Sequence, residues 1–210
     1  QPPLYYFLLS PAYMLAKTLS LPTQVLLLRL LSMAIASCVI FLAYSIANHV
    51  LHRQDLAVLT AILAACLPGL FIDVCRIGHD PLAIVLIAAM VLVSIRACYR
   101  PPGALEWIGM GLLFGAGALA KAYALAVWPL LPLVAGLLLA KHPERWKRTA
   151  LGFGLASVAA IAVAGSWYGQ ILITTGTLSG EQLHVAAGGL TLAEKFAALS
   201  AMDWPRVVDS

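Results

Sequence analysis

The sequence predicts an all-α fold: a polytopic membrane helical bundle of about six transmembrane helices, with an interfacial helix at the N-terminus. Two observations lead to this prediction. Hydrophobic residues make up 62% of the chain and charged residues only 10%, whereas soluble domains carry about 25% charged residues. Several apolar stretches also approach the roughly 20 residues that a helix needs to cross a bilayer. No separate soluble core is therefore predicted.

The first apolar stretch, residues 4–17, is too interrupted for a full crossing. It holds two adjacent tyrosines, Pro11 and a basic end at Lys17, which is typical of a helix lying in the membrane interface. Pro11 is expected to break this helix. The first crossing is expected over residues 23–47. Arg29 lies in its first two turns, where its side chain either reaches the headgroups or faces a cavity.

The middle of the chain predicts two more crossings and the polar connectors around them. A polar loop over residues 48–55 precedes a crossing over residues 56–72. A charged connector over residues 73–81 leads to a crossing over residues 82–95, and a basic turn follows over residues 96–103.

Residues 109–140 contain a single charged side chain, Lys121. Read with the apolar residues from Ala104 onward, one continuous helix here would span about 55 Å, while the hydrocarbon core is about 30 Å thick. Two helices of about 17 residues fit if the chain turns near Lys121, because an amine at the turn reaches the headgroups. Lys121 is therefore predicted at a membrane surface, where it either snorkels or binds a phosphate of a lipid-linked substrate.

The C-terminal part predicts one more crossing and an external tail. A basic loop over residues 141–148 precedes a crossing over residues 149–168. Residues 1–168 are therefore assigned to a transmembrane core, and residues 169–210 to an extracytoplasmic loop. Thr191 and Glu194 have the spacing of a capping box, which predicts a short amphipathic helix over residues 191–201.

The distribution of basic residues predicts the orientation. Loops 48–55, 96–103 and 141–148 are expected on the cytoplasmic side, because they hold most of the loop cations. These cations are Arg53, Arg96, Arg100, Lys141, Arg145, Lys147 and Arg148. The connector 73–81 and Lys121 then face outward. The net charge of +4 is explained by this loop bias, so nucleic acid is not an expected partner.

The outward connector is the densest polar segment, and each of its side chains has a structural alternative. Asp73, Arg76 and Asp80 have spacings of three and four residues, so they can pair on one helix face. Asp80 precedes Pro81, which is also the pattern of an N-cap followed by a first-turn proline. His79 titrates near neutral pH and is otherwise a solvated loop residue.

Glycines precede Lys121 at positions 109, 111, 115 and 117. A phosphate-binding loop would require a preceding strand, which the sequence does not offer. The spacing of Gly111 and Gly115 instead favours close packing of membrane helices, which would hold Lys121 in a fixed place. The four cysteines show no metal-ligand spacing, so no metal site is predicted.

Taken in order, four segments resemble the GT-C type membrane glycosyltransferases, a superfamily that includes the protein O-mannosyltransferases, the aminoarabinose transferases and the family 39-like enzymes. Residues 2–6, Pro-Pro-Leu-Tyr-Tyr, resemble the family's His/Lys-Pro-Pro-Leu-Tyr-Tyr segment, with Gln1 at the basic position. Arg29 resembles the arginine of the following helix. The segment from Arg76 to Asp80 resembles the loop that ends in an aspartate, and residues 115–121 resemble the Gly-x-x-x-Leu-x-Lys turn.

This resemblance implies a glycosyltransferase of the bacterial cytoplasmic (inner) membrane, which moves a sugar from a polyprenyl-phosphate carrier to an acceptor hydroxyl on the outer face. The implied partners are membrane lipid, the lipid-linked sugar donor and an acceptor lipid, glycan or protein. No cofactor is predicted, and a divalent metal is left open. We expect Asp80 and His79 to act in catalysis. The expected substrate-binding residues are Lys121, Arg76, Asp73, Arg29 and Tyr5.

The resemblance also places a general-base aspartate upstream of the Pro-Pro segment. We therefore expect the sequence to be part of a longer protein that supplies this residue. Two alternatives stay open: a multi-pass transporter or flippase, and a non-catalytic assembly subunit. Transporters place ionisable groups at the bilayer midplane, whereas the polar groups here gather at one surface. Residues upstream of Gln1 would discriminate, since an aspartate there favours the enzyme and an apolar repeat favours transport.

Overall fold

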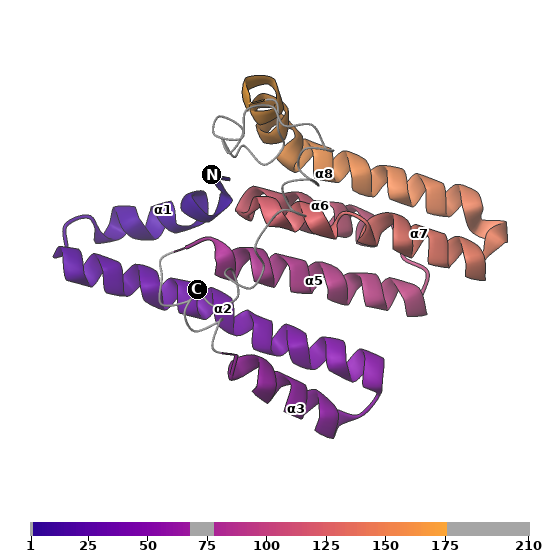
Figure 1. Cartoon of the computed structure of the whole chain (residues 1–210), viewed down its shortest axis with the longest axis horizontal. Coiled ribbons are helices and arrows are strands. Elements are labelled where there is room, and N and C mark those ends of the chain that lie inside the picture. Colours follow the sequence, from indigo (N-terminus) through magenta and orange to yellow (C-terminus); the bar gives the residue numbers. More distant parts are fainter. Residues whose placement is uncertain (1, 68–77, 176–210) are drawn as a thin grey trace, which may run out of the picture. The chain divides into compact units, whose positions relative to one another are not determined.

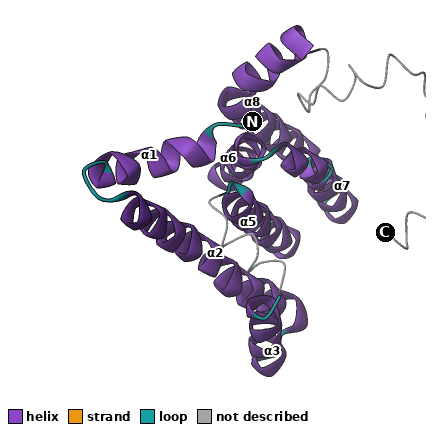
Figure 2. Ribbon diagram, turned by 60° about the vertical axis from the view of Figure 1, so that its left-hand side comes forward, coloured by secondary structure: helices purple, strands orange, loops and turns teal. Residues whose placement is uncertain are grey.

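The computed structural model describes residues 2–67 and 78–175, and within these ranges all regular structure is helical (Figures 1 and 2). The α-helices are α1 (Leu4–Ala16), α2 (Leu21–Leu51), α3 (Gln54–Ala65), α5 (Asp80–Tyr99), α6 (Ala104–Ala120), α7 (Leu130–Lys141) and α8 (Trp146–Thr175). Short 3-10 helices cover Ala122–Val127 and Pro143–Arg145. The chain forms two compact units, residues 1–170 and 171–210. The packing contacts described below lie within the first.

Four helical stretches are long and apolar enough to cross a membrane, namely Leu21–Leu51, Asp80–Tyr99, Ala122–Lys141 and Pro143–Thr174. Helices α1, α3 and α6 are apolar but shorter. The predicted fold class, a helical membrane bundle, is confirmed. The number of six crossings stays a prediction, because the predicted crossing over residues 56–72 extends beyond the described residues. The expected helix over residues 191–201 also lies outside them.

The predicted hairpin around Lys121 is present. Helix α6 has 17 residues and ends at Ala120, directly before the lysine. The return begins as a 3-10 helix and becomes the α-helix α7 only at Leu130. Two prolines explain where α7 begins: Pro129 is its N-cap, and Pro132 lies in its first turn, where a missing N–H breaks no intrahelical bond.

The predicted break at Pro11 is wrong, because α1 continues through this residue. A proline at position 11 removes the hydrogen bond that the carbonyl of Phe7 would otherwise accept. The hydroxyl of Ser10 donates to this carbonyl instead, at 3.1 Å. Local side-chain compensation of this kind is how apolar helices tolerate proline.

Helix α5 lies at the centre of the first unit, packing against α2 on one side and against α6 and α7 on the other (Figure 1). Helix α1 packs against α2 and α6, and α3 against α2. The largest buried cluster joins α5, α6, α7 and α8 around Trp107, Met110 and Met90. Side chains of four helices therefore surround one apolar core, while many other apolar side chains face outward, as in a bundle surrounded by lipid.

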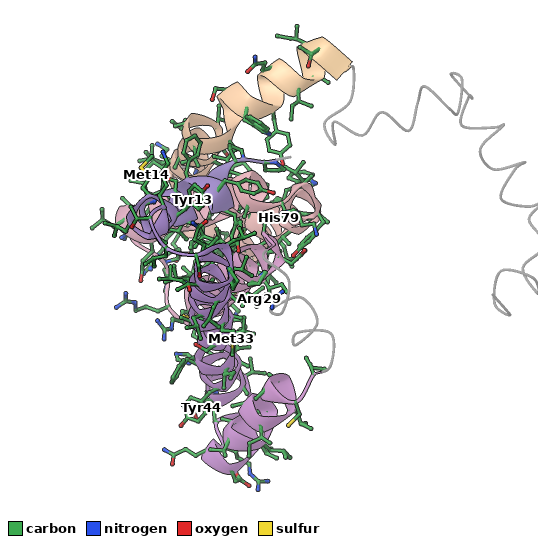
Figure 3. All side chains as sticks on the ribbon, turned by 90° about the vertical axis from the view of Figure 1, so that its left-hand side faces the viewer. Tyr13, Met14, Arg29, Met33, Tyr44 and His79 are labelled. Carbon is green, nitrogen blue, oxygen red and sulfur yellow. The ribbon has the colours of Figure 1, made fainter. Side chains whose placement is uncertain are left out.

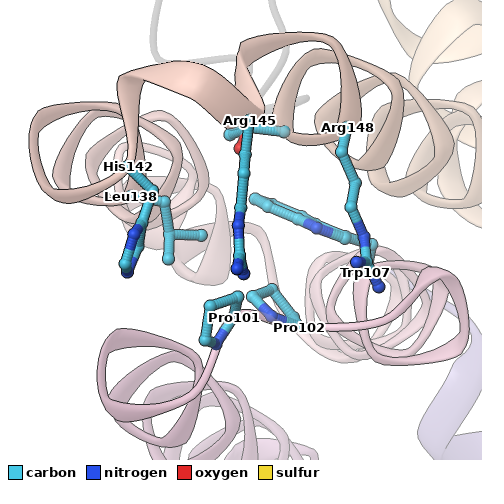
Figure 4. A pocket seen from close by; sticks show the side chains of 8 residues that line it. Pro101, Pro102, Trp107, Leu138, His142, Arg145 and Arg148 are labelled. Carbon is cyan, nitrogen blue, oxygen red and sulfur yellow. The ribbon is translucent and has the colours of Figure 1, made fainter.

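The basic loops meet at one end of the bundle. The rings of His52 and Tyr99 are 5.9 Å apart. The amine of Lys141 donates to the carbonyl of Cys98 at 3.1 Å. Figure 4 shows Arg145 reaching toward Pro101 and Pro102, with Arg148 and Trp107 lining the same small pocket. The prediction that loops 48–55, 96–103 and 141–148 share one side is thus confirmed. Their cytoplasmic location stays a prediction.

Glycines let α6 and α8 approach closely, as the Gly111/Gly115 spacing predicts. A Cβ atom on Gly111 would lie 2.1 Å from the carbonyl oxygen of Ala156, and one on Gly115 would lie 2.9 Å from the Cβ atom of Val163. The Ala156 oxygen that such a Cβ atom would meet belongs to the backbone of α8, so it cannot move aside as a side chain would. The close contact of α6 with α8 is therefore set by small residues.

We predict that Gly111→Ala destabilises the protein by about 1–3 kcal/mol, the typical cost of overpacking a well-filled contact. Gly109→Ala is the matched control, because no atom lies within 4 Å of the Cβ that it adds. That variant should be neutral or slightly stabilising, since alanine is the better helix former. Thermal unfolding in detergent measures both. Equal midpoints for the two variants would contradict the close contact of α6 with α8.

Candidate functional site

An ion pair joins two helix ends at the end of the bundle opposite the basic loops. The amine of Lys121, after the last residue of α6, donates to the carboxylate of Asp80, the first residue of α5. The two side chains are only 32% and 26% exposed. The amine also lies 5.2 Å from the centre of the Tyr123 ring. Because an ammonium has three N–H donors, the pairing with Asp80 leaves donors for a second anionic partner.

Backbone hydrogen bonds fix Lys121 on both sides. Its N–H donates to the carbonyl of Gly117 at 2.9 Å, and its own carbonyl accepts from Ala124 at 3.0 Å. The backbone of Lys121 is extended, with φ −157° and ψ 139°, which ends α6 and turns the chain. The amine therefore starts from a defined point of the backbone rather than from a flexible loop.

Tyr168 of α8 ties a second helix to this turn. Its buried hydroxyl donates to the carbonyl of Ala118 at 2.7 Å. Carbonyls in the last turn of a helix lack partners within the helix, so the tyrosine satisfies one that would otherwise be buried unpaired. Ala118, Ala164 and Tyr168 form an apolar cluster with Leu119, Leu125 and Trp167. The end of α6 is consequently held from one side by α8.

Asp80 is not the N-cap of α5, the structural alternative that the Asp-Pro pattern left open. Helix α5 begins at Asp80 itself, and the N-cap position belongs to His79, whose side chain makes no capping bond. The carboxylate is directed to Lys121 instead. An acidic side chain in the first turn still interacts favourably with the helix dipole. The lysine competes successfully for this carboxylate because it brings a full charge, whereas a cap offers a neutral N–H.

His79 lies next to this pair. Its ring centre is 6.5 Å from that of Tyr6 in α1, and its Nδ1 atom is buried without a hydrogen-bond partner among the described residues. Burial lowers the pKa of the imidazole below its usual 6.5, and the Lys121 ammonium lowers it further, against the opposing effect of Asp80. The imidazole is therefore neutral at pH 7 and can accept one hydrogen bond while donating another.

Tyr5, predicted to bind substrate, is fully buried beneath this site. Its hydroxyl is hydrogen-bonded to the hydroxyl of Ser32 in α2 at 2.7 Å, and Ser32 donates onward to the carbonyl of Leu28 at 2.9 Å. The observed contacts therefore connect Tyr5 to α2 and place it as a support for the segment around His79. Its predicted contact with substrate stays a prediction.

Arg29 is exposed on α2 and has no hydrogen-bond or ion-pair partner among the described residues (Figure 3). Arg29 lies three residues before Ser32 in α2, and Ser32 is the hydrogen-bond partner of Tyr5. Helix α2 has 31 residues and would span about 46 Å, which exceeds the bilayer core. Leu28 and Leu31, near Arg29 in the sequence, pack against the buried cluster that contains Leu82 of α5. Arg76 and Asp73 lie outside the described residues.

A buried apolar cluster and an apolar groove lie next to the Asp80–Lys121 pair. Tyr5, Leu9, Leu82, Ala83 and Ala120 form a buried cluster contributed by α1, α5 and α6, with α2 residues packed against it. On its α1 side, a groove of about 240 Å³ is lined by Tyr5, Tyr6, Leu9, Ser10, Tyr13 and Leu28. The site thus combines a cation, a carboxylate and a neutral imidazole with an adjoining apolar groove.

Three supporting residues were not predicted from the sequence. Tyr123 contacts the lysine amine, Ser32 holds Tyr5, and the hydroxyl of Tyr168 anchors α6. Tyr123 was detectable from its position two residues after the single hairpin charge. The other two depend on contacts between distant helices, which no local pattern reveals. Among the described residues, no group of three His, Cys, Asp or Glu side chains is arranged to hold a metal ion.

A double-mutant cycle should detect the coupling between Asp80 and Lys121. Asp80→Asn and Lys121→Gln each leave one partner of a partly buried pair without its counter-charge, so the double variant should lose less stability than the two single losses combined. We expect a coupling of about 1 kcal/mol or more from unfolding measurements. The Arg53–Asp55 pair, which is more than 60% exposed on both sides, is the control and should give a smaller coupling. Additive effects at Asp80 and Lys121 would contradict the ion pair.

The lowered pKa of His79 predicts a pH dependence of stability. In the unfolded chain the imidazole binds a proton more readily than in the folded one, so the free energy of unfolding should fall as pH drops through about 6.5. The loss should level off below the folded-state pKa. Unfolding midpoints between pH 8 and pH 5 measure it, and His79→Gln should flatten the curve. If His79→Gln had the same pH dependence of its unfolding midpoint as the wild type, His79 would not be the cause of that dependence.

Residues 1–168 match the family model described as dolichyl-phosphate-mannose-protein mannosyltransferase. No curated protein and no solved structure matches the chain. The matched range covers most of the 210 residues and includes every described residue of the Asp80–Lys121 site. The chain therefore belongs to the dolichyl-phosphate-mannose-protein mannosyltransferase family, whose members are membrane glycosyltransferases of the GT-C type.

Proposed function

We propose that this protein transfers a sugar from a polyprenyl-phosphate carrier to an acceptor hydroxyl on the outer face of a bacterial inner membrane. The observation that carries the proposal is the contact between Lys121 and Asp80 at the end of the bundle opposite the basic loops. Membership of a mannosyltransferase family favours a transferase over the transport and assembly alternatives. The positive-inside rule supports the outward location of this end.

The proposed chemistry assigns Lys121 to the leaving phosphate. As the acceptor oxygen attacks the anomeric carbon, the bond from that carbon to the phosphate oxygen breaks and its electron pair stays on the phosphate. The ammonium stabilises this growing charge with donors that Asp80 does not use. Asp80 fixes the direction of the amine. The acceptor's proton passes to a general base, for which the family resemblance implies an aspartate.

His79 is proposed to position the reacting groups. A neutral imidazole near the lysine can accept a hydrogen bond from a sugar or acceptor hydroxyl without adding charge. The Tyr6 ring beside it provides an apolar face suited to packing against a sugar. Arg29 and the connector residues Arg76 and Asp73 are proposed as further contacts to the donor's phosphate and sugar.

The groove between α1 and α2 is proposed to hold the first isoprene units of the carrier. Its lining of tyrosines and leucines suits a hydrocarbon chain, and Tyr5 and Tyr6 connect it to the His79 segment. Exposed apolar side chains on α1, such as Phe7 at 71% and Met14 at 71%, suit a helix lying against lipid (Figure 3). The carrier would then reach the lysine from the membrane without crossing water.

Lys121→Ala in the intact protein should lower the rate of sugar transfer by about 100-fold or more, the usual effect of removing a donor to a developing oxyanion. Lys17→Ala is the matched control: it removes the same charge from the far end of α1, about 20 Å along the helix from Tyr5, and should leave transfer nearly unchanged. Membranes supplied with a radiolabelled polyprenyl-phosphate sugar give the measurement. Near wild-type transfer by a folded Lys121→Ala variant would remove Lys121 from the site.

A further inference from the structure

A second cleft lies at the basic end of the bundle, away from the Asp80–Lys121 site. It has a volume of about 300 Å³ and is lined by His49, Arg96, Tyr99, Arg100 and Glu106. These residues come from the end of α2, the end of α5 and the beginning of α6. The volume is at the lower limit of ordinary ligand pockets. The proposed transfer reaction uses none of these side chains.

Two arginines with unequal surroundings dominate this cleft. Arg100 donates to the Glu106 carboxylate at 2.7 Å, and the other carboxylate oxygen accepts from the Gly103 N–H at 2.7 Å. This network fixes Arg100 and neutralises the glutamate. Arg96, four residues earlier, has no hydrogen-bond or ion-pair partner among the described residues. One guanidinium of the cleft is therefore held in place while the other is left for an external anion.

His49 and Tyr99 complete the lining of the cleft. The Nδ1 atom of His49 lies 2.9 Å from the Ser45 carbonyl. A carbonyl only accepts, so this nitrogen carries the hydrogen, and Nε2 of the neutral ring is an acceptor. Tyr99 is held edge-on to the His52 ring and keeps an exposed hydroxyl-bearing ring. The cleft thus offers several donors, while its one carboxylate is already paired.

The location identifies the anion. Arg96 lies in the last turn of α5, a helix of membrane-spanning length, so its guanidinium is at the depth of the lipid headgroups. Arg100 is already paired with Glu106, so the uncompensated charge of the cleft is that of Arg96. A phosphate bound by Arg96 could also accept hydrogen bonds from the Arg100 N–H groups that Glu106 does not use. A guanidinium can bind phosphate oxygens through two parallel N–H bonds. Favourable interaction with the helix dipole alone explains basic residues here, but not a cleft that collects them.

We propose that this cleft binds the phosphodiester of an anionic phospholipid, with Arg96 and Arg100 as its principal ligands. Basic pockets between membrane helices commonly hold such headgroups. The bound lipid would bridge the ends of α2, α5 and α6 and so stabilise the basic end of the bundle. This inference is independent of the proposed transferase function, because it concerns the opposite end of the molecule.

Native mass spectrometry of the intact protein in detergent tests the proposal, with dioleoyl phosphatidylglycerol as the anionic probe and dioleoyl phosphatidylcholine as the zwitterionic one. Phosphatidylglycerol should bind more tightly than phosphatidylcholine. Arg96→Gln should weaken phosphatidylglycerol binding about tenfold, the effect expected when a charge-assisted hydrogen bond is lost. Arg96→Lys keeps the charge but loses the planar guanidinium. Its affinity for phosphatidylglycerol should therefore lie between those of the wild type and Arg96→Gln.

Lys147→Gln is the matched control, because it removes one positive charge from the same end but its amine lies over the Trp146 ring outside the cleft. Its affinity should stay within about twofold of wild type. Equal losses in Arg96→Gln and Lys147→Gln would overturn the proposal in favour of diffuse surface charge. Equal affinity for the two lipids would overturn it as well. Competition by soluble glycerol phosphate at concentrations similar to those of the lipid would show a free-phosphate site instead. As a folding control, Arg96→Gln without lipid should have the same unfolding midpoint as the wild type.

Discussion

The ion pair between Asp80 and Lys121 is the contact on which the arrangement of this end of the bundle depends. Charged residues are scarce in the chain, and each is costly to bury beside lipid without a partner. Pairing the first residue of α5 with the residue after α6 solves this problem for both helix ends at once. It also leaves an ammonium with unused donors at a fixed place. The same interaction that makes the hairpin compatible with a membrane thus also fixes the amine on which the proposed phosphate contact rests.

The position of that ammonium is determined by contacts that carry no charge. Gly111 and Gly115 bring α6 against α8, and Tyr168 then satisfies a carbonyl in the last turn of α6. From the opposite side, Tyr5 and Ser32 join α1 to α2 beneath the His79 segment. The site is therefore built at the meeting point of several helices, where apolar packing fixes the backbone and a few hydrogen bonds fix the side chains.

Much of this could be predicted from the sequence, and the parts that could not share a physical reason. Membrane dimensions alone place a turn at Lys121, and the glycine spacing indicates a close helix contact, because both are local properties of one segment. Helix α1 continues through Pro11 with the help of the Ser10 hydroxyl, which donates to the carbonyl that the proline leaves unpaired. The general tendency of proline to break helices does not take such a neighbour into account. Capping of α5 was the structural alternative for Asp80 because the Asp-Pro pattern is local, whereas the partner observed, Lys121, lies 41 residues away in the chain. The hydrogen bond from Tyr168 to Ala118 could not be predicted for the same reason, because the two residues are far apart in the sequence.

The central claim is that the Asp80–Lys121 end of the bundle faces outward while the basic end faces the cytoplasm. Labelling of introduced thiols by a membrane-impermeant maleimide in intact cells tests it most directly, using a background in which the four cysteines are serine. Tyr123→Cys, beside the lysine, should react in intact cells. Glu144→Cys, in the basic loop, should react only after the membrane is opened. Labelling of Glu144→Cys from outside, or protection of Tyr123→Cys until the membrane is opened, would contradict the account.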